Sequence, residues 1–429
     1  MKVLIVGNGI AGNEVAFSLR KARMDLDITI VSAERFPEYD PCSLPYFIGR
    51  DVPRQTVFRK TWDDYRSHRI NLLLEQRVMS IDPEARHATT EKGLTLGYDR
   101  LVLAHGGSLF IPPIAGIDTP GVHSCKQLSE ADRLDQSSGS AAVVIGSGAI
   151  GIEAGEALKK RGYEVTVIEL LDWILPALFD PESSRRLEES LQRCGIRVLT
   201  SEKVLAIEGA ERVSAVVTDK RRIPCDTVVI ATGVVPGKAL AQTAGIEVQR
   251  GIRVNEHLQT SAPGIFACGD CVETVDACTG EDAMFQLKHN ALEQAQVVAR
   301  NILGVTSAYP GAWAFARAHF FDTHAVTFGK TTRATQCELG QLEIVERDEG
   351  PDYLRVIVKE GLVVGGQAIG KFADVIGLFM GAMGRKGRHP EHPAELAPHR
   401  PERLDHPLDH PQTLGTDRLK IMRASATPS

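Results

Sequence analysis

The amino-acid sequence predicts an α/β fold with two Rossmann-like, three-layer ββα nucleotide-binding domains and a small α+β interface domain. The first observation is a short apolar run that ends in the spacing Gly7-x-Gly9-x-x-Gly12 and continues as a helical pattern. The second is that the chain repeats this strand–glycine–helix pattern between residues 141 and 169. Each copy has the order of elements that a dinucleotide-binding turn requires. The repeat therefore predicts two bound dinucleotides.

The glycines of the first motif each have a separate role. Gly7 allows a sharp turn, Gly9 allows the backbone to approach a pyrophosphate, and Gly12 allows the helix to pack closely on the strand. The unpaired N–H groups of the first helical turn, which includes Ala11, face the anion. An acid about 20 residues later is expected to bind ribose hydroxyls. Glu34 stands 22 residues after Gly12 and is our candidate, the alternative being a solvated loop carboxylate.

The second motif carries its own acid in a better position. Its glycines are Gly146, Gly148 and Gly151, and Glu169 follows the second strand pattern directly, 18 residues after the last glycine. No Lys or Arg follows Glu169 before Arg185. A carboxylate in this position would repel a ribose 2′-phosphate, so the second motif favours NAD(H) over its phosphorylated form.

The Pro-rich segment 36–52 is expected to form a loop that opens into a short helix, with Cys42 in its middle. A lone cysteine is most often a small core residue. A thiol at a helix start beside a redox ring can instead have a lowered pKa and exchange electrons or disulfides. The residues alone leave both alternatives open.

After the second motif the chain is expected to return to the first domain. A strand pattern ends at Gly269 and Asp270, and an apolar helical pattern follows at 291–299. The acid can bind a ribityl chain while the helix N-terminus faces a pyrophosphate. Cys268 and Cys271 flank Asp270 in a C-x-x-C spacing that is also typical of a redox dithiol or half of a zinc site. Without a second pair, we favour two incidental cysteines and expect no metal.

The sequence divides into four parts. We expect a discontinuous FAD-binding domain at residues 1–115 and 240–307 and an NAD-binding domain at residues 116–239. An interface domain at residues 308–384 and a His/Pro-rich extended tail at residues 385–429 follow. The first domain also shows short strand patterns of an antiparallel ribbon at 72–78, 87–90 and 94–96. The interface domain shows strand patterns at 323–328, 342–346, 354–359 and 362–368, followed by a helix at 373–380.

Composition and charge exclude several classes of function. The net charge of −6 and the pI near 6.1 argue against a nucleic-acid surface and a polybasic membrane patch. No apolar run approaches the length of a membrane span. The first strand begins at residue 2, where a cleaved signal peptide would remove the glycine turn, so we expect a cytoplasmic protein. The eight scattered cysteines do not form a disulfide framework.

Five motifs in order resemble the FAD-dependent pyridine nucleotide-disulfide oxidoreductases over residues 1–385. They are G-N-G-I-A-G from Gly7, a degenerate A-T-G at 104–106, G-S-G-A-I-G-I-E from Gly146 to Glu153, A-T-G at 231–233, and T-S-A-P-G-I-F-A-C-G-D ending at Asp270. The resemblance implies that FAD binds the first motif together with Gly269 and Asp270. It also implies that NAD(P)H binds the second motif, with Glu153 and Gly233 among its residues.

The segment Y-D-P-C-S-L-P-Y-F-I-G around Cys42 is similar to the single-cysteine segment of CoA-disulfide reductases and NADH oxidases. In that group the thiol carries a mixed disulfide or a sulfenic acid. Two residues depart from the group. Ile10 stands where oxidase and peroxidase members have a histidine, and His105 replaces the usual threonine of the first A-T-G. No C-x-x-x-x-C of the glutathione reductase type follows the first helix, and the second domain has no C-x-x-C of the thioredoxin reductase type.

Our first hypothesis is a cytoplasmic FAD subunit that passes electrons between NAD(H) and an iron–sulfur partner. Flavins convert two-electron into one-electron transfer, and this chain has no cluster-ligating cysteine spacing of its own. Its size and tail resemble the FAD subunit of multi-subunit 2-oxoacid oxidoreductases such as phenylglyoxylate dehydrogenase. The alternative is a free-standing homodimer that uses Cys42 as an NAD(P)H-dependent CoA-disulfide reductase or NADH oxidase. A scaffold with degenerate sites is a third alternative, against which the intact glycines and Asp270 argue.

Overall fold

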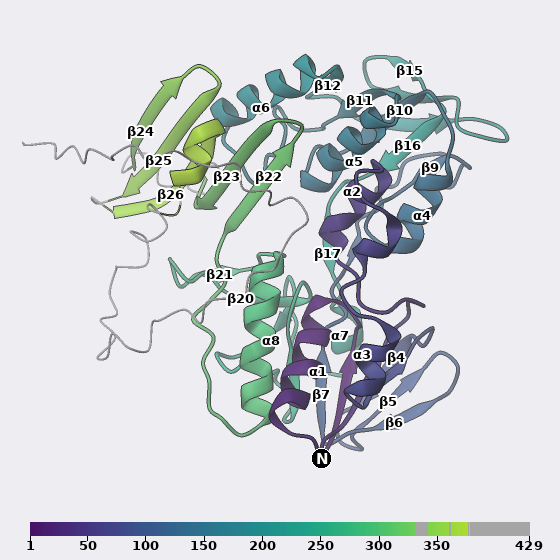
Figure 1. Cartoon of the computed structure of the whole chain (residues 1–429), viewed down its shortest axis with the longest axis vertical. Helices are drawn as coiled ribbons and strands as arrows, with labels where there is room; N and C mark the ends of the chain where they lie inside the picture. The colour runs from purple at the N-terminus through teal and green to yellow at the C-terminus, as the bar shows by residue number, and fades with distance from the viewer. Residues whose placement is uncertain (332–341, 360–361, 376, 378–429) are drawn as a thin grey trace, which may run out of the picture. The chain divides into compact units, whose positions relative to one another are not determined.

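The computed structural model describes residues 1–331, 342–359, 362–375 and 377. Its first sheet, which includes β7 (Figure 1), has five parallel strands in the order β19-β7-β1-β2-β3. The strands are β1 (Lys2–Val6), β2 (Asp27–Val31), β3 (Ile70–Leu73), β7 (Arg100–Leu103) and β19 (Ile265–Ala267). Their apolar runs fit a parallel sheet that is covered on both faces.

Different elements cover the two faces of this sheet. Val3 and Ile5 of β1 belong to the core beneath α1 (Ile10–Ala22) and α8 (Lys288–Ile302), which lie side by side. Leu4 and Val6 belong to the core beneath an antiparallel ribbon. The ribbon consists of β4 (Val78–Asp82), β5 (His87–Thr90) and β6 (Thr95–Gly97). Alternate residues of a strand point to opposite faces, which produces the predicted three layers.

The second sheet repeats this arrangement in the order β12-β11-β10-β16-β9. It contains β9 (Val122–His123), β10 (Ala141–Ile145), β11 (Glu164–Ile168), β12 (Ile196–Leu199) and β16 (Thr227–Ile230). One face packs on α5 (Ala149–Lys160) and its neighbours α4 (Leu128–Gln136) and α6 (Pro181–Arg193). The other packs on β13 (Val204–Glu208), β14 (Ala215–Thr218) and β15 (Arg222–Pro224). Two Rossmann-like ββα units are therefore present.

Two connections join the sheets, and they pair with each other. Strands β8 (Gly107–Leu109) and β17 (Val234–Pro236) form an antiparallel pair. The Nε2–H of His105, which stands before β8, donates to the carbonyl oxygen of Gly237, which follows β17. Three short elements complete the first unit: α7 (Ala239–Thr243), β18 (Ile252–Arg253) and the β20 (Val272–Val275) and β21 (Asp282–Ala283) hairpin.

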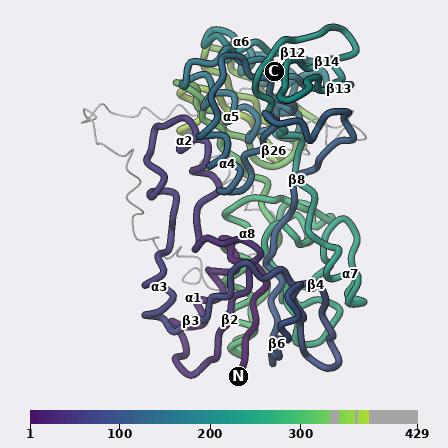
Figure 2. The backbone as a smooth tube through the Cα atoms, turned by 90° about the vertical axis from the view of Figure 1, so that its right-hand side faces the viewer, coloured from purple at the N-terminus to yellow at the C-terminus, as the bar shows by residue number. Residues whose placement is uncertain are grey.

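The Cys42 segment leaves the first unit and packs on the second. It contains a one-turn helix η1 (Pro41–Ser43), α2 (Leu44–Ile48) and η2 (Arg54–Val57), before α3 (Trp62–Ser67) returns to the first sheet. Leu44, Phe47 and Ile48 are buried in the core that includes α4 and α5. Figure 2 shows α2 beside those helices. The segment therefore spans both nucleotide-binding units.

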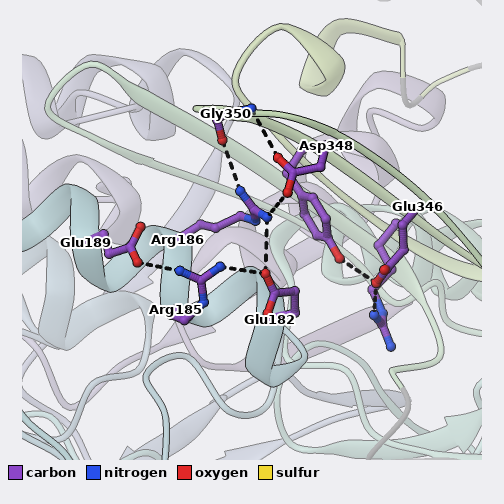
Figure 3. A network of polar contacts seen from close by, with 9 residues as sticks. Glu182, Arg185, Arg186, Glu189, Glu346, Asp348 and Gly350 are labelled. Carbon is purple, nitrogen blue, oxygen red and sulfur yellow. Dashed lines mark hydrogen bonds and ion pairs between the residues drawn. The ribbon is translucent and has the colours of Figure 1, made fainter.

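The interface domain is an antiparallel sheet in the order β22-β23-β26-β25-β24. Its strands are β22 (Phe315–Phe320), β23 (Thr323–Gly329), β24 (Leu342–Glu349), β25 (Asp352–Lys359) and β26 (Leu362–Ile369), with η4 (Gly370–Val375) against it. The sheet packs on α5 and α6 of the second unit. Figure 3 shows the polar part of this contact, in which Arg186 of α6 reaches Glu182, Asp348 and the carbonyl oxygen of Gly350.

Several sequence predictions need correction. The expected ribbon strand at 72–78 is wrong, because residues 70–73 form β3 of the parallel sheet and the ribbon begins at Val78. The helix α4 and the strand β22 were not predicted. The expected helix at 373–380 begins as the 3-10 turn η4 and then runs outside the described residues, as does the whole tail 385–429. The proposed domain limits remain predictions. No helix in the described ranges is both long and apolar enough to cross a membrane.

Candidate cofactor site

The two glycine turns have the same geometry. Gly7 has a φ of +115° and Gly146 a φ of +103°, a conformation that favours glycine. A Cβ added at Gly7 would lie 2.3 Å from the carbonyl oxygen of Ala104, and one added at Gly146 would lie 2.4 Å from that of Ala231. Each turn therefore passes so close to the end of the neighbouring strand that only glycine fits.

The remaining glycines have two different roles: one pair allows the helix to pack on the turn, and the other leaves space for a ligand. A Cβ added at Gly12 or Gly151 would lie 2.1 Å from the carbonyl oxygen of the first glycine of the same motif, so these positions hold helix and turn together. A Cβ added at Gly9 or Gly148 would meet no atom of the described chain within 4 Å. Both helices begin there without a side-chain cap. Open space beside uncapped helical amides suits a pyrophosphate.

A polar network that sequence reasoning missed holds the first turn in place. The buried Asn13 of α1 donates to the carbonyl oxygen of Asn8 at 2.8 Å, and its own Oδ1 accepts from Tyr65 at 2.8 Å. The Nδ2 of Asn8 donates to the carbonyl oxygen of Phe36 at 2.9 Å. These bonds link the glycine turn to α3 and to the start of the Cys42 segment. The signal in the sequence is only two asparagines at ordinary positions.

The carboxyl ends of the first sheet gather the expected acid Glu34 and the pair Gly269 and Asp270 at one edge. Glu34 lies after β2 and accepts a hydrogen bond from Tyr39 at 2.8 Å. Burial raises the pKa of both Glu34 and Asp270, while the ammonium of Lys126 acts to lower each. Lys126 is therefore within electrostatic reach of both carboxyls. Sequence reasoning missed Lys126, because it follows β9, about 90 residues after Glu34.

Gly269 brings the end of β19 against α1. Its φ is +81°, and a Cβ added there would lie 3.1 Å from the Cβ of Ala11 in the first helical turn. Its amide donates to the Oε1 of Gln294 on α8 at 2.7 Å. The residues that the resemblance assigns to one cofactor, Ala11, Gly269 and Asp270, are thus brought together by the fold, although more than 250 residues separate them.

Glu169 lies beside the second glycine turn. Its carboxylate accepts from the amide of Ser147 at 3.0 Å, from the Ser147 hydroxyl at 2.5 Å and from the amide of Leu171 at 2.9 Å. The turn and the acid are therefore one unit, in the place where a ribose would be held. Gly233, at the end of β16, has a φ of +109° and accepts from the amide of Phe110 at 2.9 Å.

The structure places Cys42 at the junction of the two units and bears on the two alternatives for its thiol. Its side chain is exposed, yet surrounding protein atoms and the Asp40 carboxylate raise the pKa of the thiol to about 11. Of the two alternatives that the sequence leaves open, a lowered pKa is the one that the structure does not favour, because burial and then the Asp40 carboxylate raise this pKa more than Lys288 lowers it. The carboxylate of Glu153 on α5 raises the same pKa and the ammonium of Lys288 lowers it, so both lie near Cys42.

Lys288 is the first residue of α8, and its ammonium group is paired with a carboxylate. It forms an ion pair with Asp40, whose carboxylate also lies 3.7 Å from Arg59 and accepts the amide of Cys42 at 3.1 Å. The positive charge nearest to the thiol is thereby engaged by an acid. Cys268 and Cys271, the other cysteines singled out from the sequence, are fully buried thiols, and burial raises the pKa of Cys271 to about 12.

An open groove of about 290 Å³ adjoins the start of α8. Leu287, the residue before Lys288, lines it together with apolar side chains that include Phe285 and Phe315. Two basic residues, Arg250 and Lys330, and three acids complete its rim. The groove is as large as the smaller clefts that bind small molecules. It offers a route by which an acceptor can approach the α8 terminus.

The residues present fit two dinucleotides. Each glycine turn gives close packing, free space and uncapped amides, and each sheet presents an acid at the edge where a ribose would lie. The fit does not depend on Cys42. The individual cofactor contacts of Gly7, Gly9, Glu34, Gly148, Glu169 and the other expected site residues remain proposals.

Comparison with known proteins agrees with this geometry. Residues 1–297 match a family model described as pyridine nucleotide-disulphide oxidoreductase. An NADH oxidase from Methanocaldococcus jannaschii is 35% identical over 320 residues, which are 72% of this chain and 71% of that protein. An NAD-dependent persulfide reductase from A. fulgidus is 31% identical, with a TM-score of 0.83 over 89% of this chain and 77% of that one. Putidaredoxin reductase in its covalent complex with putidaredoxin is 26% identical, with a TM-score of 0.83 over 90% and 93%.

Proposed function

The chain belongs to the pyridine nucleotide-disulphide oxidoreductase family and is an FAD-dependent NAD(H) oxidoreductase, and we propose that it passes electrons between NAD(H) and an iron–sulfur protein. When bound, FAD supplies the conversion between the two-electron chemistry of NAD(H) and one-electron carriers. In this proposal the chain's own residues hold the two cofactors at the carboxyl ends of the two parallel sheets.

The observation that carries this proposal is the state of Cys42. The thiolate is the reactive form of cysteine, and the thiol of Cys42 has a pKa of about 11 beside the Asp40 carboxylate. The cation that could activate it, Lys288, is paired with that same carboxylate. A route in which electrons pass from the cofactor directly to an acceptor does not need an activated thiol.

The acceptor that we propose is a protein with an iron–sulfur centre. The groove beside the α8 terminus gives an acceptor access from outside, and putidaredoxin reductase, a structural relative, forms a complex with putidaredoxin. We further propose that the partner belongs to a multi-subunit 2-oxoacid dehydrogenase of the phenylglyoxylate type. None of the three relatives named above is such a subunit, so this finer assignment rests on the size and tail of the chain.

A second candidate function is favoured by the position of Cys42. Its side chain is exposed, and it lies near residues of both units, Lys288 and Glu153. Once ionised, a thiol at this junction can attack one sulfur of a small disulfide substrate, which forms a mixed disulfide and releases the other half of the substrate as a thiolate. In this alternative a homodimer reduces CoA disulfide, a persulfide or oxygen with NAD(P)H through Cys42, as the names of two relatives suggest.

Replacement of Cys42 by serine separates the two candidates. We expect the C42S protein to transfer electrons from NADH to a ferredoxin-type protein and to ferricyanide within about twofold of the unchanged protein. The matched control is C278S, because Cys278 is another exposed thiol with a raised pKa and lies far along the chain in a different loop. A collapse of NADH turnover with every acceptor in C42S alone would contradict the proposal and support the thiol mechanism.

A further inference from the structure

A small cavity lies between the Cys42 segment, α5 and the interface domain. Its volume is about 10 Å³, which is at the lower limit for one water molecule. Titratable side chains dominate its wall. They come from four different places in the chain: Tyr46 of α2, Asp51 after α2, Glu153, Glu156 and Lys160 of α5, and His319 of β22.

Glu153 is one of the residues that line the cavity. Its carboxyl group makes no hydrogen bond or ion pair with any of the residues that the structure describes, although the surrounding protein largely encloses it. Glu153 acts on the pKa values of both Cys42 and Tyr46, which stands one helical turn after Cys42. Glu153 therefore lines the cavity and is also within electrostatic reach of Cys42 at the junction of the two nucleotide-binding units.

The other charged residues of the lining contact one another and the interface domain. Glu156 accepts from the amide of Phe321 at 2.9 Å and pairs with Lys160 at 3.0 Å, and Lys160 also pairs with Asp51 at 2.8 Å. These three charged groups hold one another in place. His319, which lines the cavity, stacks on the exposed His324 with ring centroids 4.3 Å apart. Glu153 and His319 thus line the same cavity, and His319 is in contact with an exposed imidazole.

Oxidation of NADH yields NAD⁺, one proton and two electrons. When the electrons leave to a one-electron acceptor, that proton must leave the enclosed site, and when a disulfide is reduced, a proton must enter. We propose that Glu153 carries this proton between the junction and the cavity, from which His319 exchanges it with solvent. The inference rests on the NAD(H) oxidoreductase activity and not on the identity of the acceptor.

The acid–base properties of Glu153 suit this task. Burial, and then the charge of Glu156, raise the pKa of Glu153 to about 7. Burial, and then the charge of His324, lower the pKa of His319 from its ordinary value. Groups that take up and release protons near neutral pH transfer them most effectively. The alternative role for Glu153 is a contact to the nicotinamide cofactor alone, which needs no ionisation.

Proton release in a single turnover tests the proposal. The FAD-loaded protein is mixed with NADH and then with ferricyanide in weak buffer with a pH indicator, so that each NADH releases one proton and reduces two ferricyanide ions. We expect the E153Q protein to release the proton at least about tenfold more slowly and to lose the ionisation near pH 7 from the rate profile. Glutamine keeps the size and hydrogen-bonding capacity of the side chain, and the Kd for NADH of E153Q is measured alongside, because Glu153 is also an expected NAD(H)-binding residue; a change in that Kd with proton release at the normal rate would assign Glu153 to cofactor binding alone.

The matched control is E293Q. Glu293 is a half-buried glutamate of α8 whose pKa burial also raises, and it does not line the cavity. E293Q should release the proton at the normal rate, and H319Q should slow it as E153Q does. The same rate and pH profile in E153Q as in the unchanged protein would overturn the proposal. If E153Q fails to bind FAD, unchanged proton release in H319Q would overturn it instead.

Discussion

Glu169 is the single residue that sets the expected choice of nicotinamide cofactor. Its carboxylate is fixed by the amides of Ser147 and Leu171 at the edge where a ribose would lie. Because hydrogen bonds to charged groups contribute about 1.5–3 kcal/mol, E169A should lower kcat/KM for NADH by about 10-fold to 100-fold. The ratio of kcat/KM for NADH and NADPH should fall with it, because the repulsion of a 2′-phosphate is also removed.

Glu164 provides the control for this prediction, since it is an exposed acid at the start of the same strand, β11. E164Q should leave both kcat/KM values unchanged. A preference for NADH that survives in E169A would show that Glu169 does not select the cofactor.

The thiol of Cys42 should react slowly at neutral pH. With a pKa of about 11, roughly one thiol in a thousand is ionised at pH 8. The rate of alkylation by iodoacetamide, followed at Cys42 by mass spectrometry, should therefore rise about tenfold for each pH unit between pH 7 and 10. A rate that reaches a plateau between pH 8 and 9 would mean that the thiol is activated, and would favour the second candidate function.

The candidate residues Cys42, Gly269 and Asp270 could be predicted from the sequence, but the groups that contact them could not. Asp40 is two residues from Cys42, yet its effect depends on the ion pair with Lys288, about 250 residues away. Lys126 and Gln294 approach Asp270 and Gly269 only after the sheet forms. Such contacts leave no pattern in the sequence, so the sign of the Cys42 pKa shift could not be predicted.

The strand–glycine–helix element makes a sharp prediction about which glycine serves the fold and which serves the ligand. An alanine at Gly146 would have a φ of +103° and a Cβ 2.4 Å from the Ala231 oxygen, so G146A should lower the free energy of unfolding by at least about 2 kcal/mol. At Gly148 the backbone angles are ones that alanine adopts without strain, and the added Cβ would lie in open space.

G148A should therefore keep its stability within about 0.5 kcal/mol and bind NADH more weakly, because the methyl group enters the space assigned to the pyrophosphate. Chemical unfolding and the Kd for NADH measure the two effects separately. Equal loss of stability in both variants, or unchanged NADH affinity in G148A, would contradict the roles assigned to the glycines.

Elements with a strong local pattern could be predicted, and elements stabilised by distant packing could not. The glycine motifs combine a turn that only glycine adopts with an amphipathic helix, so both were predicted within a few residues. The helix α4 lies in a stretch with many polar residues, and only its buried Leu128, Ala131 and Leu134 hold it on the second sheet. Residues 70–73 pair in the parallel sheet as β3, whereas β4 pairs in the antiparallel ribbon. Local propensity does not determine which of the two sheets a strand joins.

At the scale of the whole molecule, the interface domain is held on the second unit by the contact shown in Figure 3. Arg186 is largely buried there, bonded to Glu182, Asp348 and the Gly350 carbonyl, and its guanidinium stacks on Tyr353 at 4.3 Å. R186A removes the stacking on Tyr353 and the bond to the Gly350 carbonyl, whereas its two acidic partners are exposed and become solvated, so we expect a cost of about 2 kcal/mol in the free energy of unfolding.

The neighbouring Arg185 is the control, because it is exposed and pairs with Glu182 and Glu189 on the surface of α6. R185A should cost at most about 1 kcal/mol. Chemical unfolding of both variants checks the difference. Equal stabilities would mean that the contact in Figure 3 does not hold the domain.

The overall architecture was predictable because the family's five motifs occur in order, but the junction was not. The packing of α2 on α4 and α5 brings the Cys42 segment into the second unit, and β22 closes the cavity behind Glu153. Both features depend on side chains that meet across three parts of the chain. The candidate cofactor residues follow from sequence, whereas the proton path follows only from the structure.

Purification of the chain from its native host, with an absorption spectrum and a count of the chains that remain bound, tests the central claim most directly. We predict a yellow protein that brings along at least one subunit containing iron and acid-labile sulfide, and whose iron–sulfur absorption bleaches when NADH is added. A yellow homodimer without iron, which consumes NADH with CoA disulfide, a persulfide or oxygen and loses that activity in C42S, would contradict the claim.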